Sequence, residues 1–115
     1  MDIIELTREL GKALQNDDRY IAYQLAKQVN DNDEELQKLI NEFEALRGEL
    51  NAELAKQERD SERIKQIDSD IKSHYRSIMS NRNMTVFAAA QSALESLVSS
   101  MNQIISMCAN GEDPD

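Results

Sequence analysis

The chain has 115 residues, which allows one domain with one hydrophobic core. It carries 13 Lys and Arg against 22 Asp and Glu, for a net charge of −9. An acidic surface repels phosphate groups and anionic lipids, so we expect no direct binding to nucleic acid or to a membrane surface. The densest basic cluster is interleaved with acidic residues and is interpreted as a solvated mixed-charge face; it comprises Arg59, Arg63, Lys65, Lys72 and Arg76.

The composition excludes a sheet. There are three Gly, one Pro, no Trp and few aromatic residues, whereas strands need β-branched and aromatic runs bounded by Gly/Pro turns. The single Cys108 excludes an intrachain disulfide and fits a reducing compartment. The start is acidic and amphipathic, unlike a signal peptide, and the sparsely charged stretch 83–109 is too polar for a membrane span. We therefore expect an all-α, cytoplasmic protein.

Two short helices are expected first. Apolar residues at helical spacing predict a helix over about 2–15, and a second apolar stripe predicts another over about 18–29. The residues expected to face inward in the second helix are Ile21, Ala22, Leu25, Ala26 and Val29. Residues 30–33 form the next break, with Asp33 as a helix cap.

A heptad seam follows, at Leu36, Leu39, Phe43, Leu46 and Leu50, and its phase returns at Ile64, Ile67, Ile71, His74 and Ile78. The seam positions between the two sets are polar: Glu53, Gln57 and Asp60. The absence of Gly and Pro there favours one continuous helix. The polar gap and the possible caps at Asp60 and Ser61 favour a hairpin that turns near residues 58–61. We favour the hairpin, because a continuous seam would bury three polar side chains.

The last helix begins near residue 83, with a seam from Phe87 to Cys108, and Asn110-Gly111 is a typical helix end. The sequence thus predicts an antiparallel bundle of four to five helices with a long helical hairpin. We expect a single domain over residues 1–110, with both long seams in one core, and a disordered acidic tail over 111–115.

Small residues occupy the side of two helices opposite the seams. On the third helix this back row is Ala45, Gly48, Ala52 and Ala55; on the last helix it is Ala89, Ser92, Ser96, Ser99 and Ser106. Small side chains let a neighbouring helix approach closely, although they also tolerate water. We interpret both rows as candidate oligomer interfaces, with a homodimer through the last helix.

The candidate chemical sites are sparse. Cys108 falls on a seam position and is expected to be a buried core thiol, and His74 is expected to be a packed or boundary histidine. No nucleophile–base pair, phosphate loop or metal-ligand set can be assembled from the sequence, so we expect no enzyme activity and no cofactor. The alternative is a metal or iron–sulfur protein that uses Cys108 or His74 across subunits.

The chain resembles a known family through motifs that cover nearly its whole length. They are Leu6-x-x-x-Leu10-Gly11-x-Ala13-Leu14, Asp18-x-Tyr20-x-x-Tyr23-x-x-Ala26, Asp33-x-Glu35-Leu36-x-x-Leu39-Ile40-x-x-Phe43, Asn83-x-x-Val86-x-x-x-x-Ala90-Gln91 and Asn102-x-Ile104-Ile105. These residues resemble the YlbF/YmcA family of small helical proteins from Gram-positive bacteria. In length and ending the chain is most similar to the short YheA-like branch.

The resemblance implies a regulatory complex that modulates ribonuclease Y and affects competence, sporulation and biofilm formation. Some members carry extra cysteines in a C-terminal extension that bind an iron–sulfur cluster, whereas this chain has Cys108 alone. The functional hypothesis is therefore a non-enzymatic adaptor that binds its own copies and other protein subunits.

Overall fold

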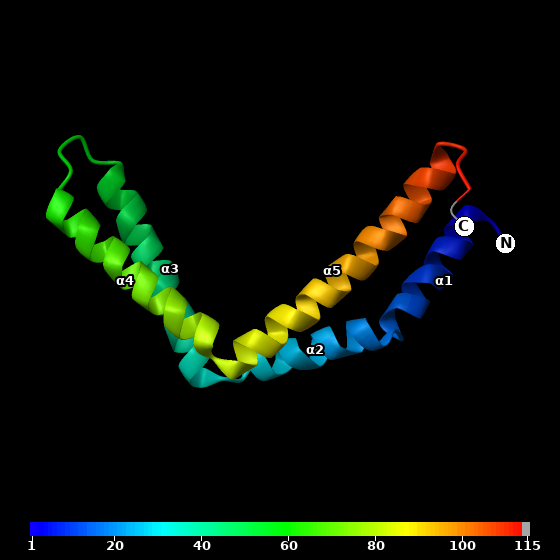
Figure 1. The fold of residues 1–115 in the computed structure, drawn as a ribbon, viewed down its shortest axis with the longest axis horizontal. Coiled ribbons are helices and arrows are strands. Elements are labelled where there is room, and N and C mark those ends of the chain that lie inside the picture. Colours follow the sequence, from blue (N-terminus) through cyan, green and yellow to red (C-terminus); the bar gives the residue numbers. More distant parts are fainter. Residues whose placement is uncertain (114–115) are drawn as a thin grey trace. The chain divides into compact units, whose positions relative to one another are not determined.

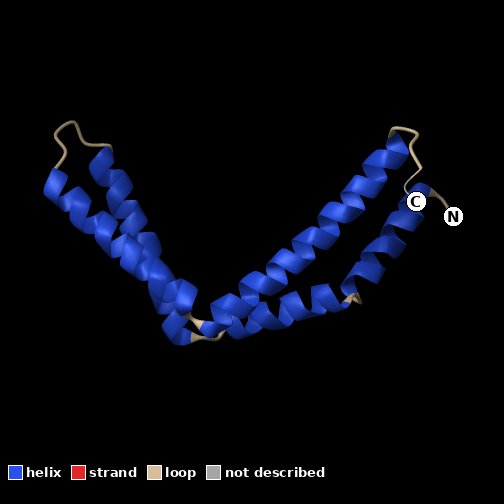
Figure 2. Cartoon of the chain, in the orientation of Figure 1, coloured by secondary structure: helices blue, strands red, loops and turns tan. Residues whose placement is uncertain are grey.

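The computed structural model describes residues 1–113 and contains five α-helices and no strand within them (Figures 1 and 2). The helices are α1 (Ile3–Gln15), α2 (Asp18–Asp31), α3 (Glu34–Leu54), α4 (Ser61–Ser80) and α5 (Arg82–Ala109). The all-α class predicted from the sequence is confirmed, and the five helices lie within the predicted range of four to five.

Aspartates begin three of the helices. The Asp2 carboxylate accepts the Glu5 N–H at 2.8 Å, Asp33 accepts that of Leu36 at 3.0 Å, and Asp60 accepts that of Glu62 at 3.1 Å. Each bond satisfies an amide that has no partner within its own helix. At the other end of the chain, Gly111 takes a positive φ of 77° after α5, a conformation that favours glycine. The expected tail over 111–115 lies in part outside the described residues, because Pro114 and Asp115 are not described.

The chain separates into two compact units, which are described one by one. The hairpin unit is Gln28–Thr85 and contains α3 and α4; the terminal unit is Met1–Lys27 together with the chain from Val86 onward. The two long heptad seams therefore belong to different units. A single domain over residues 1–110 stays a prediction.

In the hairpin unit, α3 and α4 run antiparallel and side by side (Figure 1). The hairpin is thus confirmed and the continuous helix is wrong, because the chain leaves helical structure after Leu54 and re-enters it at Ser61. Its core contains Leu36, which is fully covered, with Ile67 and Ile78. These three side chains lie on the predicted seam.

The turn of the hairpin is organised by Glu53, which is only 3% exposed. Its carboxylate accepts the Asp60 N–H at 3.0 Å and the Lys56 ammonium at 2.8 Å, and Arg63 lies 3.7 Å away. The bond from Lys56, followed by that from Asp60, lowers the pKa of Glu53, so the side chain stays charged. Glu53 is one of the polar seam positions that favoured a hairpin over a continuous helix. Its hydrogen bonds connect the two ends of the turn.

The terminal unit places α1 and the first part of α2 beside α5 (Figure 1), with the rings of Tyr23 and Phe87 at 5.5 Å between centroids. No described residue of α1 or α5 is buried. In α2 the inward-facing prediction is right for Ala26. It is wrong for the exposed residues Ile21, Ala22 and Leu25, and for Val29 of the hairpin unit, which is also exposed. Ile21 and Leu25 are exposed because only one layer of helix lies against α5 in the terminal unit. A single layer cannot enclose a large apolar side chain on all sides.

We expect Leu36→Ala to lower the free energy of unfolding by about 2–5 kcal/mol, because it leaves a cavity at a fully covered position. Leu54→Ala on the same helix is the matched control; Leu54 is 39% exposed, so we expect a loss below about 1 kcal/mol. Urea denaturation followed by circular dichroism measures both. Equal losses would contradict the placement of the core.

Candidate protein-binding surfaces

An apolar groove runs between α1 and α5 in the terminal unit. Its volume is about 160 Å³, and it is lined by Leu10, Ala13, Leu14, Asp17, Leu97 and Met101. Side-chain and backbone hydrogen bonds from Arg19 lower the pKa of Asp17 to about 2, so this member of the lining is charged at neutral pH. The remaining five lining residues are apolar.

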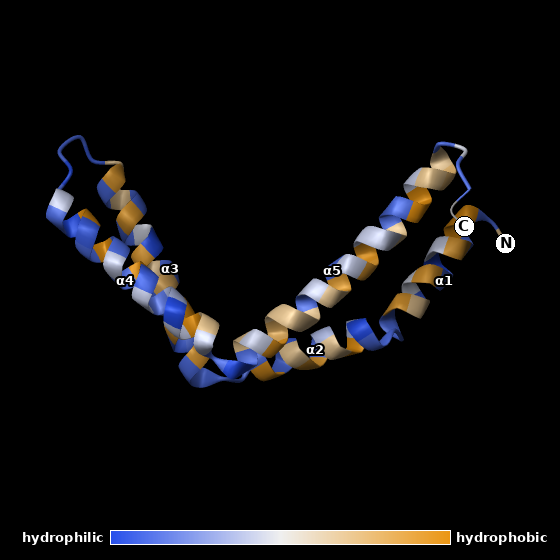
Figure 3. Cartoon of the chain, in the orientation of Figure 1, coloured by the Kyte–Doolittle hydropathy of each residue, from blue (hydrophilic) through white to orange (hydrophobic). Residues whose placement is uncertain are grey.

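Both helices also carry hydrophobic residues over much of their length, as the hydropathy colouring of α1 and α5 shows (Figure 3). They are exposed to solvent at the following positions: Ile3, Leu6, Leu10, Ile104 and Ile105. On α1 they recur at spacings of three and four residues, which places them on one helix face. We call the groove and these residues the α1–α5 apolar surface. Monomeric proteins rarely expose contiguous apolar patches beyond a few hundred Å², so such a surface indicates a binding partner.

The two rows of small residues predicted from the sequence lie on the surface. Ala89, Ser92, Ser96, Ser99 and Ser106 are all exposed on α5. In the hairpin unit the same holds for Ala45, Gly48 and Ala52 of α3 and for Ala55, the residue that caps its C-terminal end. A Cβ built on Gly48 would meet no atom within 4 Å. Neither row is covered within its own unit, and an interface through them stays a prediction.

The candidate metal residues are not brought together. Cys108 is exposed, so the prediction of a buried core thiol is wrong, since no helix covers the last turn of the α5 seam. His74 is a partly buried boundary residue in the hairpin unit. Within residues 1–113 there is no group of three or more His, Cys, Asp or Glu that could hold a metal ion.

His74 joins the two helices of the hairpin. Its Nε2 lies 2.9 Å from a carboxylate oxygen of Glu42 on α3, and its Nδ1 lies 3.0 Å from the backbone oxygen of Asp70. The bond to Glu42, followed by that to Asp70, raises the pKa of His74. No sequence pattern predicts this pair, because its members are 32 positions apart and meet only through the hairpin register.

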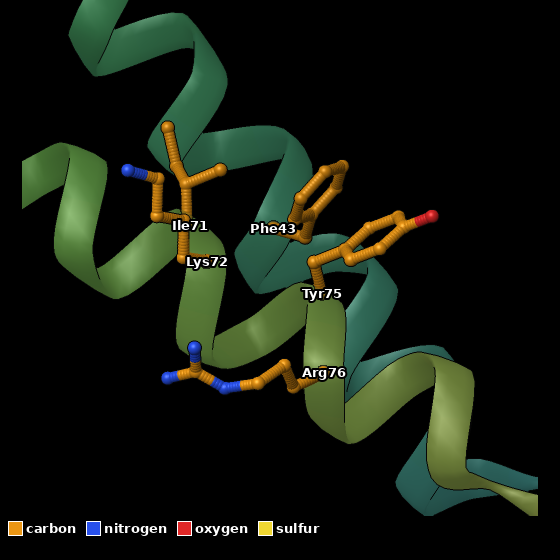
Figure 4. Close-up of a pocket in the computed structure, with 5 residues that line it drawn as sticks. All are labelled: Phe43, Ile71, Lys72, Tyr75 and Arg76. Atoms are coloured by element: carbon orange, nitrogen blue, oxygen red, sulfur yellow. The ribbon is translucent and has the colours of Figure 1, made fainter.

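An aromatic pocket lies on another part of the hairpin (Figure 4). Its volume is about 310 Å³ and it is lined by Phe43 of α3 and by Ile71, Lys72, Tyr75 and Arg76 of α4. The Phe43 and Tyr75 rings are tilted, with 6.3 Å between centroids. The heptad pattern placed Phe43 on the seam and gave no role to Tyr75. The one sequence signal for Tyr75 is that it directly follows the seam position His74.

A family model described as "Control of competence regulator ComK, YlbF/YmcA" matches residues 3–108. The chain belongs to the YlbF/YmcA family. No curated protein and no solved structure gave a significant match.

Membership of the YlbF/YmcA family places the chain among bacterial regulatory proteins, which are generally non-enzymatic. Within residues 1–113, no helix has the length and apolarity required to cross a membrane.

The raised pKa of His74 predicts a pH-dependent hairpin. The interaction is fully present below the ordinary histidine pKa of about 6.5 and is lost as pH rises through the raised value. Glu42→Gln removes the charge that attracts the imidazolium. We therefore expect the difference in Tm between wild type and Glu42→Gln to be larger at about pH 5.5 than at about pH 8.5.

Glu44→Gln is the matched control, because Glu44 is an exposed carboxylate on the same helix and is paired with Arg47 rather than with a histidine. Its Tm difference from wild type should be the same at both pH values. If the Glu42→Gln difference is also constant, the Glu42–His74 pair does not control the pH dependence.

Proposed function

We propose that this chain is a non-enzymatic regulator that acts by binding protein subunits, among them a second copy of itself. The observation that carries the proposal is the α1–α5 apolar surface, on which large apolar side chains remain exposed: Ile3, Leu6, Leu10, Ile104 and Ile105. Membership of a family of competence regulators supports a role in control.

The proposed self-association is a two-fold dimer through the back row of α5. This row is exposed, and between Asn83 and Ala109 the helix has one charged residue, Glu95. A helix face of Ala and Ser with so little charge allows close approach of a second helix. Two-fold dimers are the commonest oligomers, and each copy would supply the same surface to the other. The small residues of α3 from Ala45 to Ala55 are a further proposed contact region.

The family resemblance suggests the regulated process. We propose action in the cytoplasm within a complex that modulates ribonuclease Y, without direct contact to RNA, since the net charge of −9 opposes binding to phosphate. We also propose placement in the YheA-like branch, which the single cysteine of the sequence supports.

A second candidate function is metal or iron–sulfur binding between subunits. The exposed thiol of Cys108 favours it, since an exposed thiol is accessible to a ligand set completed by another copy. His74 supports it less, because both ring nitrogens already have partners within the hairpin. Stoichiometric iron or zinc in anaerobically purified protein would favour this function over the adaptor.

We expect sedimentation of the wild type at tens of micromolar to give the mass of two chains. Ser96→Arg places a long charged side chain in the proposed close contact, so its mass should shift toward one chain with unchanged helix content by circular dichroism. Ser69→Arg is the matched control, because Ser69 is an exposed serine on α4, outside the terminal unit. Its mass should equal that of the wild type.

A monomeric wild type would overturn the proposed self-association. A dimer that persists in Ser96→Arg but dissociates in Leu6→Arg would keep the self-association and move the interface to the α1–α5 apolar surface. Leu6 is 54% exposed, so the arginine has space in a free monomer.

A further inference from the structure

The hairpin unit has a core of its own, and the aromatic pocket lies outside it. Ile67 and Ile78 of α4 are buried between the helices, whereas Tyr75 on the same helix is 53% exposed. Phe43 is partly buried, and its ring faces that of Tyr75 across the helix pair (Figure 4). The hairpin therefore packs its core while the ring of Tyr75 stays accessible to a partner.

The size of the pocket suits a side chain of a partner. Its volume of about 310 Å³ is at the lower end of the range for ligand pockets, which is roughly 300–1,000 Å³. The rings and Ile71 supply an apolar wall. Protein interfaces concentrate their binding energy in such places, where one aromatic or aliphatic anchor is buried in a pocket.

The charge around the pocket is opposite to that of the whole chain. The net charge is −9, yet both charged residues in the lining, Lys72 and Arg76, are cations. A third cation, Arg47, lies with its guanidinium 5.8 Å from the centre of the Phe43 ring. Because exposed charges are screened beyond about 8 Å at physiological ionic strength, charges close to the pocket act on a partner more strongly than the net charge of the chain does.

The three cations are not equally engaged. Lys72 is paired with Asp68 at 2.9 Å and Arg47 with Glu44 at 3.4 Å. The guanidinium of Arg76 has no acidic partner within residues 1–113. A planar guanidinium binds a carboxylate through two parallel hydrogen bonds, so Arg76 is suited to an acidic group that arrives with a partner.

We propose that the aromatic pocket binds a short acidic segment of a partner protein, in which a bulky apolar side chain is flanked by Asp or Glu. The apolar side chain enters the pocket against Phe43, Ile71 and Tyr75, and a flanking carboxylate pairs with Arg76. This inference rests on the proposed function of protein binding. It adds a second surface, in a different unit from the α1–α5 apolar surface and with different chemistry.

The probe is a synthetic peptide with the sequence Gly-Asp-Glu-Trp-Glu-Asp-Gly, blocked at both ends. The chain contains no Trp, so the tryptophan emission comes from the peptide alone. We expect a blue shift on titration with full-length protein, because the indole leaves water for an apolar pocket. The matched peptide Gly-Lys-Lys-Trp-Lys-Lys-Gly should give no shift, and added salt should weaken the binding of the acidic peptide.

Two variants test separately how the aromatic wall and the charge of the pocket contribute to peptide binding. Tyr75→Ala removes an exposed wall, and Arg76→Glu reverses the unpaired charge; we expect each to weaken binding by about tenfold or more. Lys65→Glu is the control, since it makes the same charge change on the same helix, at an exposed residue outside the pocket. Its affinity for the peptide should match that of the wild type.

Absence of a blue shift at millimolar acidic peptide would overturn the inference, as would equal binding of the lysine peptide or wild-type affinity in Arg76→Glu. Indole-3-acetate that binds as tightly as the peptide would assign the pocket to small aromatic acids instead. Sedimentation tests the self-association independently of peptide binding. A dimer that does not bind the peptide contradicts only the pocket inference. A monomer that binds the peptide contradicts only the self-association.

Discussion

Within each unit, the described helices pack against one another on one side only, and this constraint determines which side chains are buried. In the hairpin unit the seams of α3 and α4 meet face to face, and the contact covers Leu36 completely. In the terminal unit a single layer lies beside α5, and no described residue of α1 or α5 becomes buried. A chain of this length that left its apolar faces open in solution would lose much of the free energy that burial supplies.

The exposed apolar faces of the helices fit a family of regulatory proteins. A regulator that acts by contact needs surfaces rather than a catalytic cleft, and the two units offer surfaces of different chemistry. The α1–α5 apolar surface is nearly free of charge, with Asp17 in the groove. The aromatic pocket of the hairpin is bordered by Lys72 and Arg76. Surfaces that differ in this way allow one chain to bind unlike partners, as an adaptor must.

The charged residues of the hairpin divide into two kinds. Glu53 and the Glu42–His74 pair are used within the fold: the first holds the turn, and the second joins the two helices midway. Most of the other ion pairs lie on exposed surface between neighbouring turns of one helix, as in Lys65–Glu62, and contribute little to stability. Arg76 belongs to neither kind, since no carboxylate of the described chain neutralises it.

The sequence by itself determined the secondary structure, because helix ends and helix faces depend on residues only a few positions apart. The caps at Asp33 and Asp60, the turn after Leu54 and the seam residues Leu36, Ile67 and Ile78 all follow from local spacing and from side chains that bond to nearby amides. Spacing identifies the apolar face of a helix, but it does not show whether another helix covers that face.

Only the tertiary structure decided which of these faces are covered. It exposes Ile21, Leu25 and Cys108, which spacing alone assigned to a core. It also brings Glu42 to His74 and Phe43 to Tyr75, pairs that are 32 residues apart in the chain and that depend on the register of the hairpin. That register follows from the packing of α3 on α4, which leaves no periodic signal in the sequence.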